Sequence, residues 1–263
     1  MQAPFSRCRF QLCAALAIGI AIATSASAAS AADLLQPTYA VLSLVGDEFS
    51  VVTRRAETGT RIDPNDRRSF PITDATFDSI ATNAAEQALK RARPVAPVLI
   101  FSIRDPRLFE LQDRLLVESA ESHGLREVLA KLLRDNQASQ LIVITKRRDD
   151  AQFELRSTRV GGGKLSGLGF YIDPYIPLTR FETGEIDNGF LAPFAYVSVT
   201  IVDVASMRVV RSVPARESLI RLSIDAKGAL RAWDALSPEA KVDALDQVLR
   251  RAVDKATTAA VAD

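Results

Sequence analysis

The segment RVGGGKLSGLGFYIDPY, residues 159–175, holds five of the chain's twelve glycines and a Gly-Lys pair, so it is a candidate phosphate-binding loop. The P-loop pattern G-x-x-x-x-G-K-[ST] requires a hydroxyl residue after the lysine and a helix that begins there. Here Gly163-Lys164 is followed by Leu165 instead. Thr158 stands where the first glycine belongs. Because β-type residues follow, no helix N-terminus would face a phosphate, and the glycines predict a bend or wide hairpin between strands.

Residues for metal or nucleophile chemistry are scarce. The chain has one histidine, His123, at a predicted helix break, and its two cysteines, Cys8 and Cys13, lie near the N-terminus. Zinc sites need cysteine and histidine ligands, and a serine triad would have to use His123 without any G-x-S-x-G turn. The sequence therefore assigns no catalytic residue, no cofactor and no metal site. A carboxylate pair for hydrolysis stays open, because 32 acidic residues allow many pairs in space.

The first residues have the composition of an export signal. Arg7 and Arg9 precede an apolar run over 12–23 and then small residues, the order typical of a secretory signal peptide. The run is too short to span a bilayer as a helix. We expect 1–32 to be a signal peptide and 33–263 to be one mixed α/β domain. The mature chain would then lie in the periplasm or be secreted, without cysteine and without a transmembrane helix.

Hydrophobic patterning predicts the elements that must position any site. Continuous apolar runs at 97–104 and 140–148 are typical of strands covered on both faces, and each follows a helix-type pattern. Residues 194–204 alternate apolar and polar and precede a hairpin partner at 207–223. We therefore expect an α/β (α+β) fold, a mixed β-sheet of about six to eight strands with three to four helices packed on it.

Three further stretches complete the prediction. Residues 38–45 and 49–55 are β-rich and flank Gly46-Asp47, so we expect them to form a hairpin. The polar stretch 56–71 is broken by Gly and Pro and predicts a long surface loop. Residues 158–193 fit neither pattern and predict a long, irregular insert rich in glycine and aromatic residues.

Apolar residues in the insert either cover a sheet edge or form an exposed patch for a partner. The more specific hypothesis is that these residues form an exposed patch that binds a partner. On this hypothesis, we expect a deletion of 164–188 to leave a folded core. The residues assigned to partner binding on this hypothesis are Lys164, Leu168, Phe170, Tyr171, Asp173, Tyr175 and Phe190.

Parts of the chain resemble known envelope proteins. ASQLIVITKRRDDAQFELRST followed by FAYVSVTIVDVASMRVVRS resembles the exported α/β domains of Gram-negative envelope assembly proteins, such as the TolB N-terminal domain and the curli-secretion CsgG group. The resemblance covers about residues 77–212 and lies in element order. YAVLSLVGD, GKLSGLGFYID and NGFLAPFAY look more closely like segments of uncharacterised secreted proteobacterial proteins. Both resemblances imply an exported α/β fold, and neither implies an activity.

These observations favour an exported, noncatalytic envelope protein that binds a protein or envelope component through the insert. With 33 basic and 32 acidic residues, the chain has no charge excess that would indicate nucleic acid as a partner. Two alternatives stay open, a carboxylate-dependent periplasmic hydrolase and a small-molecule binding protein. Facing acids in a deep cleft would favour the hydrolase, and a closed apolar pocket under the insert would favour the small-molecule protein.

Overall fold

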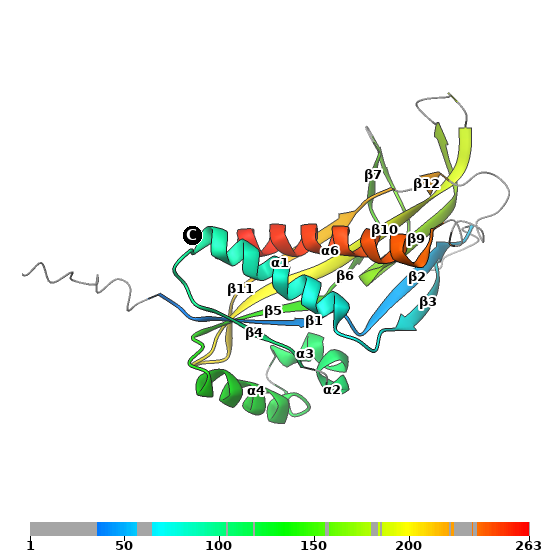
Figure 1. The fold of residues 1–263 in the computed structure, drawn as a ribbon. Coiled ribbons are helices and arrows are strands. Elements are labelled where there is room, and N and C mark those ends of the chain that lie inside the picture. Colours follow the sequence, from blue (N-terminus) through cyan, green and yellow to red (C-terminus); the bar gives the residue numbers. More distant parts are fainter. Residues whose placement is uncertain are drawn as a thin grey trace, which may run out of the picture. The chain divides into compact units, whose positions relative to one another are not determined.

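The computed structural model contains a ten-stranded mixed sheet, in which the apolar runs 39–44 and 140–146 form adjacent strands (Figure 1). The strands of the sheet are β1 (Tyr39–Leu44), β2 (Glu48–Arg54), β3 (Asn65–Pro71), β4 (Val98–Phe101), β5 (Gln140–Lys146), β6 (Arg148–Asp150), β9 (Lys164–Thr179), β10 (Ile186–Asp203), β11 (Arg208–Ser218) and β12 (Leu222–Ser223). β1 pairs in parallel with both β4 and β5, and all of its residues are buried. The predicted mixed α/β sheet is confirmed.

The structure describes residues 36–56, 65–103, 105–117, 119–155, 158–179, 184, 186–220, 222–223, 233 and 236–262. The expected signal peptide, 1–32, lies outside these residues, so it stays a prediction. Residues Gln36–Asp263 form one compact unit, and the description below concerns this unit alone.

β10 joins the two halves of the sheet. Its C-terminal half pairs antiparallel with β5, and its N-terminal half pairs with β9 along the same edge. Its opposite edge pairs with β11 and β12, which confirms the hairpin predicted for 194–204 and 207–223. β9 pairs in parallel with β2, and β2 pairs with β3. The strand order is therefore β3-β2-β9-β10-β5-β1-β4.

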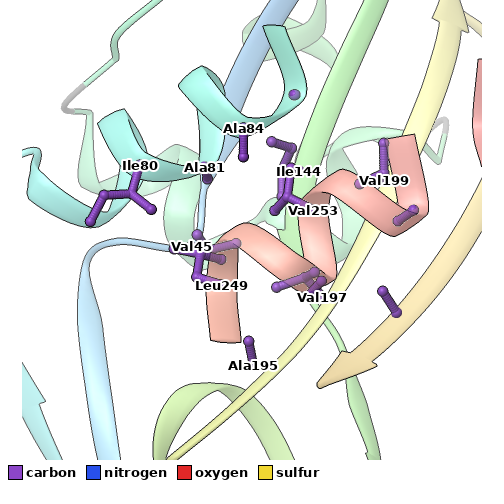
Figure 2. Packing of buried hydrophobic residues seen from close by; sticks show 14 of the residues in the cluster. Val45, Ile80, Ala81, Ala84, Ile144, Ala195, Val197, Val199, Leu249 and Val253 are labelled. Carbon is purple, nitrogen blue, oxygen red and sulfur yellow. The ribbon is translucent and has the colours of Figure 1, made fainter. Parts of the chain in front are cut away.

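Helices α1 (Thr76–Ala92) and α6 (Pro238–Val261) lie side by side on one face of the sheet (Figure 1). Ser237 and Pro238 start α6 as an N-cap and first-turn proline, and Ser237 Oγ accepts a hydrogen bond from the Ala240 amide at 3.2 Å. Figure 2 shows apolar side chains of both helices meeting those of β5 and β10, among them Ile80, Ala81, Ala84, Ile144, Val197, Val199, Leu249 and Val253. The small alanines of α1 allow this close contact.

Two separate layers cover the other face. At the end formed by β1, β5 and the C-terminal part of β10, α2 (Pro106–Glu110), α3 (Gln112–Leu115) and α4 (His123–Asp135) cover a leucine-rich cluster. At the end formed by β9 and the N-terminal part of β10, a two-stranded sheet of β7 (Phe153–Leu155) and β8 (Thr158–Val160) covers an aromatic cluster. The described residues thus contain five helices, against three to four expected.

The hairpin predicted for 38–45 and 49–55 is wrong. Both edges of β1 are occupied by β4 and β5, so β2 pairs with β3 and β9 instead. Gly46 lets the chain pass close to α1, because a Cβ there would lie 2.8 Å from the Asp78 amide nitrogen. The predicted loop 56–71 is also wrong in part, since 65–71 forms β3, while 57–64 lie outside the described residues.

The irregular insert predicted for 158–193 is likewise wrong. The segment supplies β8, β9 and the start of β10. β8 belongs to the two-stranded sheet, whereas β9, together with β3, helps raise the main sheet to ten strands, above the six to eight expected. β9 is a central strand between β2 and β10. Deleting 164–188 would remove that strand, so the expectation that such a deletion leaves a folded core does not hold.

The close contact between β2 and β9 at Gly169 leads to a prediction about the free energy of unfolding. A Cβ at this position would lie 2.0 Å from the Ser50 carbonyl oxygen, so Gly169→Ala must push the two strands apart. We expect a loss of roughly 2–3 kcal/mol in the free energy of unfolding, measured by urea denaturation. Gly124→Ala in α4 is the control, since a Cβ there meets nothing within 4 Å and alanine favours the helix by up to about 1 kcal/mol. Equal effects of the two substitutions would contradict the close pairing of β2 with β9.

Candidate functional site

Most of the residues predicted to bind a partner lie inside the protein. Leu168 and Phe170 pack beneath α1 and α6, whereas Tyr171 and Phe190 join the cluster under β7 and β8. Asp173 is fully buried as well. These five residues belong to β9 and β10, which are strands of the sheet itself, so their side chains neither form an exposed patch nor cover a sheet edge.

Two of the predicted residues reach the surface. Tyr175 is 52% exposed. Lys164, at the other end of β9, is partly exposed and forms an ion pair with Asp150. The structure therefore does not bring the seven predicted residues together into one patch, and Tyr175 is the apolar side chain of the set that a partner can contact.

The glycine segment packs inward. The Tyr171 hydroxyl accepts a hydrogen bond from the Gly162 amide at 3.0 Å and donates one to the Gly162 carbonyl at 3.3 Å. Asn65 Nδ2 donates to the same carbonyl at 2.8 Å. Gly161 has a φ of +121°, which favours glycine and turns the chain beside Ala151. Residues 161–163 form a bend between β8 and β9, as predicted, whereas Gly167 and Gly169 lie within β9. Burial raises the pKa of the Tyr171 hydroxyl that holds this bend.

A buried ion pair marks the point where β2 ends beside β9. Asp173 Oδ2 lies 3.0 Å from Arg54 Nη1, and Asp173 Oδ1 accepts a hydrogen bond from the Tyr175 amide at 3.0 Å. The Arg54 side chain is 20% exposed and that of Asp173 is 0% exposed. Asp173, predicted from the sequence to contact a partner, instead pairs with Arg54 inside the protein.

Beyond this pair, β9 and β10 continue as a two-stranded ribbon. β2 pairs with β9 only as far as Ile172, and β12 pairs with β10 at Phe190 and Leu191. Residues 173–179 and 186–189, here called the distal ribbon, have no further strand neighbour among the described residues. Figure 1 shows this ribbon rising past β12.

Acidic residues line a pocket at the carboxyl ends of β1 and β4. Asp47, Asp74, Asp78 and Glu110 contribute to this cavity of about 250 Å³. Asp78 Oδ1 accepts hydrogen bonds from Ser43 Oγ at 2.7 Å and from the amides of residues 45 and 46 at 3.1 and 3.0 Å. Burial raises the pKa of Asp78, while the Ser43 and amide hydrogen bonds oppose this effect. Asp78 therefore ties α1 to the end of β1.

Asp47 and Glu48 follow β1, where the sequence predicted the turn of a hairpin. Their carboxylates lie 2.6 and 3.1 Å from Lys146 Nζ, where β5 ends. Within the part of the chain that the structure describes, no three His, Cys, Asp or Glu side chains are grouped so that they would hold a metal ion. Among those same residues, no helix combines the length and apolar character needed to cross a membrane.

A second cavity, of about 550 Å³, lies between β11, α6 and the β7–β8 hairpin. Four of its charged side chains form two pairs, and the fifth, Arg216, lies 4.0 Å from Asp149 outside the lining. Glu217 lies 3.1 Å from Lys255 Nζ, and Glu154 lies 3.7 Å from Arg159. These contacts fasten β11 to α6 and β7 to β8, so the cavity presents little charge that is not already compensated.

A third cavity, next to Phe70 and Trp233, was missed entirely by the sequence analysis. Phe70 belongs to the stretch predicted as a loop, and Trp233 follows it by more than 160 positions along the chain. The signal available was the single tryptophan of the chain, in a segment without a clear hydrophobic period.

Comparison with known proteins gives only distant likenesses. No protein-family model matches the chain, and the curated proteins give no match. The PelC dodecamer from Paraburkholderia phytofirmans is 12% identical, with a TM-score of 0.31 over 87% of this chain and 89% of that chain. Protein XCC0632 from Xanthomonas campestris, a DUF330 protein, is 11% identical, with a TM-score of 0.33 over 86% of this chain and 83% of that chain.

The hypothetical protein CT253 from Chlamydia trachomatis is 10% identical, with a TM-score of 0.33 over 86% of this chain and 98% of that chain. Likenesses with TM-scores this low assign neither a family nor a function. The class that the fold itself defines is a mixed α/β protein, with a pair of long helices on one face of a sheet of long strands.

The Arg54–Asp173 pair gives a prediction about stability. Arg54→Met keeps the apolar stem but leaves a buried carboxylate without its cation, which costs roughly 3–5 kcal/mol. The double variant Arg54→Met, Asp173→Asn should recover much of this loss, because asparagine is neutral and still accepts the Tyr175 amide. Urea denaturation of both single variants and the double variant measures the coupling. Losses that simply add would show that the two side chains do not interact.

Asp78 gives a prediction about pH. Its pKa is raised above the ordinary 3.8, so its contribution to stability is full below pH 3.8 and is lost as the pH rises through the raised pKa. Asp78→Asn cannot ionise, so its stability relative to the native protein should rise over that window in urea denaturation. Asp203 is the control, because hydrogen bonds from Ser206 lower its pKa. Asp203→Asn should therefore show the opposite trend, losing relative stability as the pH rises through the lowered pKa, and equal trends would contradict both assignments.

Proposed function

We propose that this chain is an exported, noncatalytic protein of the cell envelope that binds a protein partner through the distal ribbon. Export is supported by the charged, apolar and small-residue order of 1–32. The envelope is supported by the resemblance of its element order to exported α/β domains. The observation that carries the binding role is that the distal ribbon continues past its last strand neighbour and exposes Tyr175.

The energetics of the ribbon favour a binding role. A two-stranded ribbon alone is marginally stable in water, so a partner that packs against this one would stabilise it. Its root is fixed by the Arg54–Asp173 pair, which limits the entropy lost on binding. Tyrosine offers a large, stiff, amphipathic surface and is enriched where binding energy concentrates.

The ribbon is better suited to side-chain contacts than to strand addition. Pro174 and Pro177 lie on either side of Tyr175 in β9, and each removes a backbone donor from the strand. Proline on an edge strand discourages nonspecific pairing with other chains. A partner is therefore expected to contact the Tyr175 ring and its neighbours rather than to extend the sheet.

Photo-crosslinking in cells tests this proposal. The photoreactive analogue p-benzoylphenylalanine replaces Tyr175 in one variant and Val128 in the control, because Val128 on α4 is also well exposed. We expect ultraviolet light to link one protein to position 175 and none to position 128, with mass spectrometry identifying the product. The same product at both positions, or none at 175, would overturn the proposal.

A substitution at Tyr175 measures the size of the effect. Tyr175→Ala should weaken binding of the crosslinked protein by roughly tenfold or more, as is usual for a central aromatic contact. Tyr175→Phe is the matched variant and should retain most of the affinity. Calorimetry with the purified partner provides the measurement, and an unchanged affinity for Tyr175→Ala would place the contact elsewhere.

A further inference from the structure

A groove of about 430 Å³ lies on the helix-bearing face of the sheet, over β2, β3 and β9. Its lining combines an apolar strand surface, an aromatic wall and charged residues, and consists of Val51, Thr53, Arg55, Asp66, Arg67, Arg68, Phe70, Ile172 and Trp233. We call it the aromatic–arginine groove. Its volume falls within the range of about 300–1,000 Å³ that is usual for small-molecule sites.

Strand register places these residue types together. Val51 pairs opposite Arg68, and Phe49 pairs opposite Phe70, so all four side chains share one face of the sheet. Ile172 reaches the same face from β9, where it pairs with Thr53. The floor is therefore apolar, and one edge strand, β3, provides both the charge and part of the aromatic wall.

The wall is a stack of rings. Phe70 stacks on Phe49 at 5.1 Å between centroids, and Trp233 stacks on Phe70 at 6.2 Å and on Phe49 at 6.1 Å. Phe170 meets the Trp233 ring edge-on at 5.2 Å. These contacts hold the indole in place, while Phe70 is still 38% exposed and offers its ring to a ligand.

The arginines differ in their pairing. Arg67 donates to the Lys164 carbonyl at 2.8 Å, and Arg55 pairs with Asp66. The Arg68 side chain forms no hydrogen bond or ion pair with any residue that the structure describes, while its backbone belongs to the β2–β3 pair. An arginine on an edge strand also discourages strand addition, but Arg68 stands beside an apolar floor and an aromatic wall, where it can neutralise an anion.

We propose that the aromatic–arginine groove binds a small amphiphilic anion, a single carboxylate on an apolar chain, with the head group at Arg68 and the chain against Val51, Ile172 and Phe70. A guanidinium pairs with a carboxylate through two parallel hydrogen bonds, and the apolar floor removes the chain from water. This site is independent of the distal ribbon, so either proposal can fail without the other.

Trp233 is the only tryptophan of the chain, so its fluorescence reports on this groove directly. Three dissolved probes with the same alkyl chain separate charge from apolarity: decanoate and decyltrimethylammonium, each below its micelle concentration, and decanol below its solubility limit. We expect a saturable change with decanoate, a response roughly tenfold weaker with decanol, and none with the cation. Equal responses to decanoate and decanol would overturn the role of charge.

Substitutions locate the head group. Arg68→Gln should weaken decanoate binding roughly tenfold, as expected for the loss of one charge-assisted contact, and Arg68→Lys should restore part of it. Arg134→Gln on α4, another exposed arginine, is the matched control and should bind like the native protein. Unchanged binding by Arg68→Gln would overturn the assignment.

An experiment with lipid vesicles distinguishes binding of a dissolved amphiphile from binding of a membrane lipid. Phosphatidylglycerol vesicles present anionic head groups with their chains held in the bilayer, and phosphatidylcholine vesicles serve as the reference. We expect neither to change Trp233 fluorescence as decanoate does. A response to phosphatidylglycerol vesicles without a response to decanoate would overturn the proposal in favour of a membrane surface.

Discussion

The pairing of β10 on both of its edges is the constraint on which the rest of the structure depends. Over 18 residues this strand bonds to β9 and then β5 on one edge, and to β12 and β11 on the other. Its side chains alternate between the helix layer and the two layers on the opposite face. A slip of one residue would exchange Leu191 and Ala195 with Phe190 and Phe194, and all three clusters would be lost together.

Local signals explain which elements were predicted from the sequence. α6 starts at Ser237-Pro238 and α2 at Asp105-Pro106, and each start is an N-cap followed by proline, a signal that depends only on a few adjacent residues. The apolar run of β5 and the alternating hairpin of β10 and β11 could also be predicted from adjacent residues. The run of β4 forms a strand as well, but this strand lies at the sheet edge with Ile100 exposed and is not covered on both faces. The strands that pair with β2 could not be predicted from the sequence, because β2 and β9 pair residues that lie more than 110 positions apart in the chain.

The roles of the predicted site residues also depend on contacts between distant parts of the chain. Phe170 and Tyr171 were chosen for their size within an unusual segment, and size predicts burial and surface contact equally well. The glycines gave a wrong prediction for a similar reason. The sequence predicted that Gly169 is part of a bend, but it lies in a strand, where glycine is required because the Ser50 carbonyl comes close to it. Asp173 looked chemically unusual because it lies among apolar residues, and the reason, Arg54, became visible only once β2 lay beside β9.

Both candidate binding surfaces have one physical origin: the strands of the sheet are longer than the layers that cover them. α6 begins at Pro238, and the sheet surface beside Trp233 is left to form the aromatic–arginine groove. β9 extends beyond the last residue that pairs with β2, and this extension of β9 forms one strand of the distal ribbon. The Arg54–Asp173 pair stands at that boundary. Burying two charges brings little net stability by itself, but only one register of β2 on β9 pairs them. We therefore infer that the pair fixes where β2 ends and the distal ribbon begins.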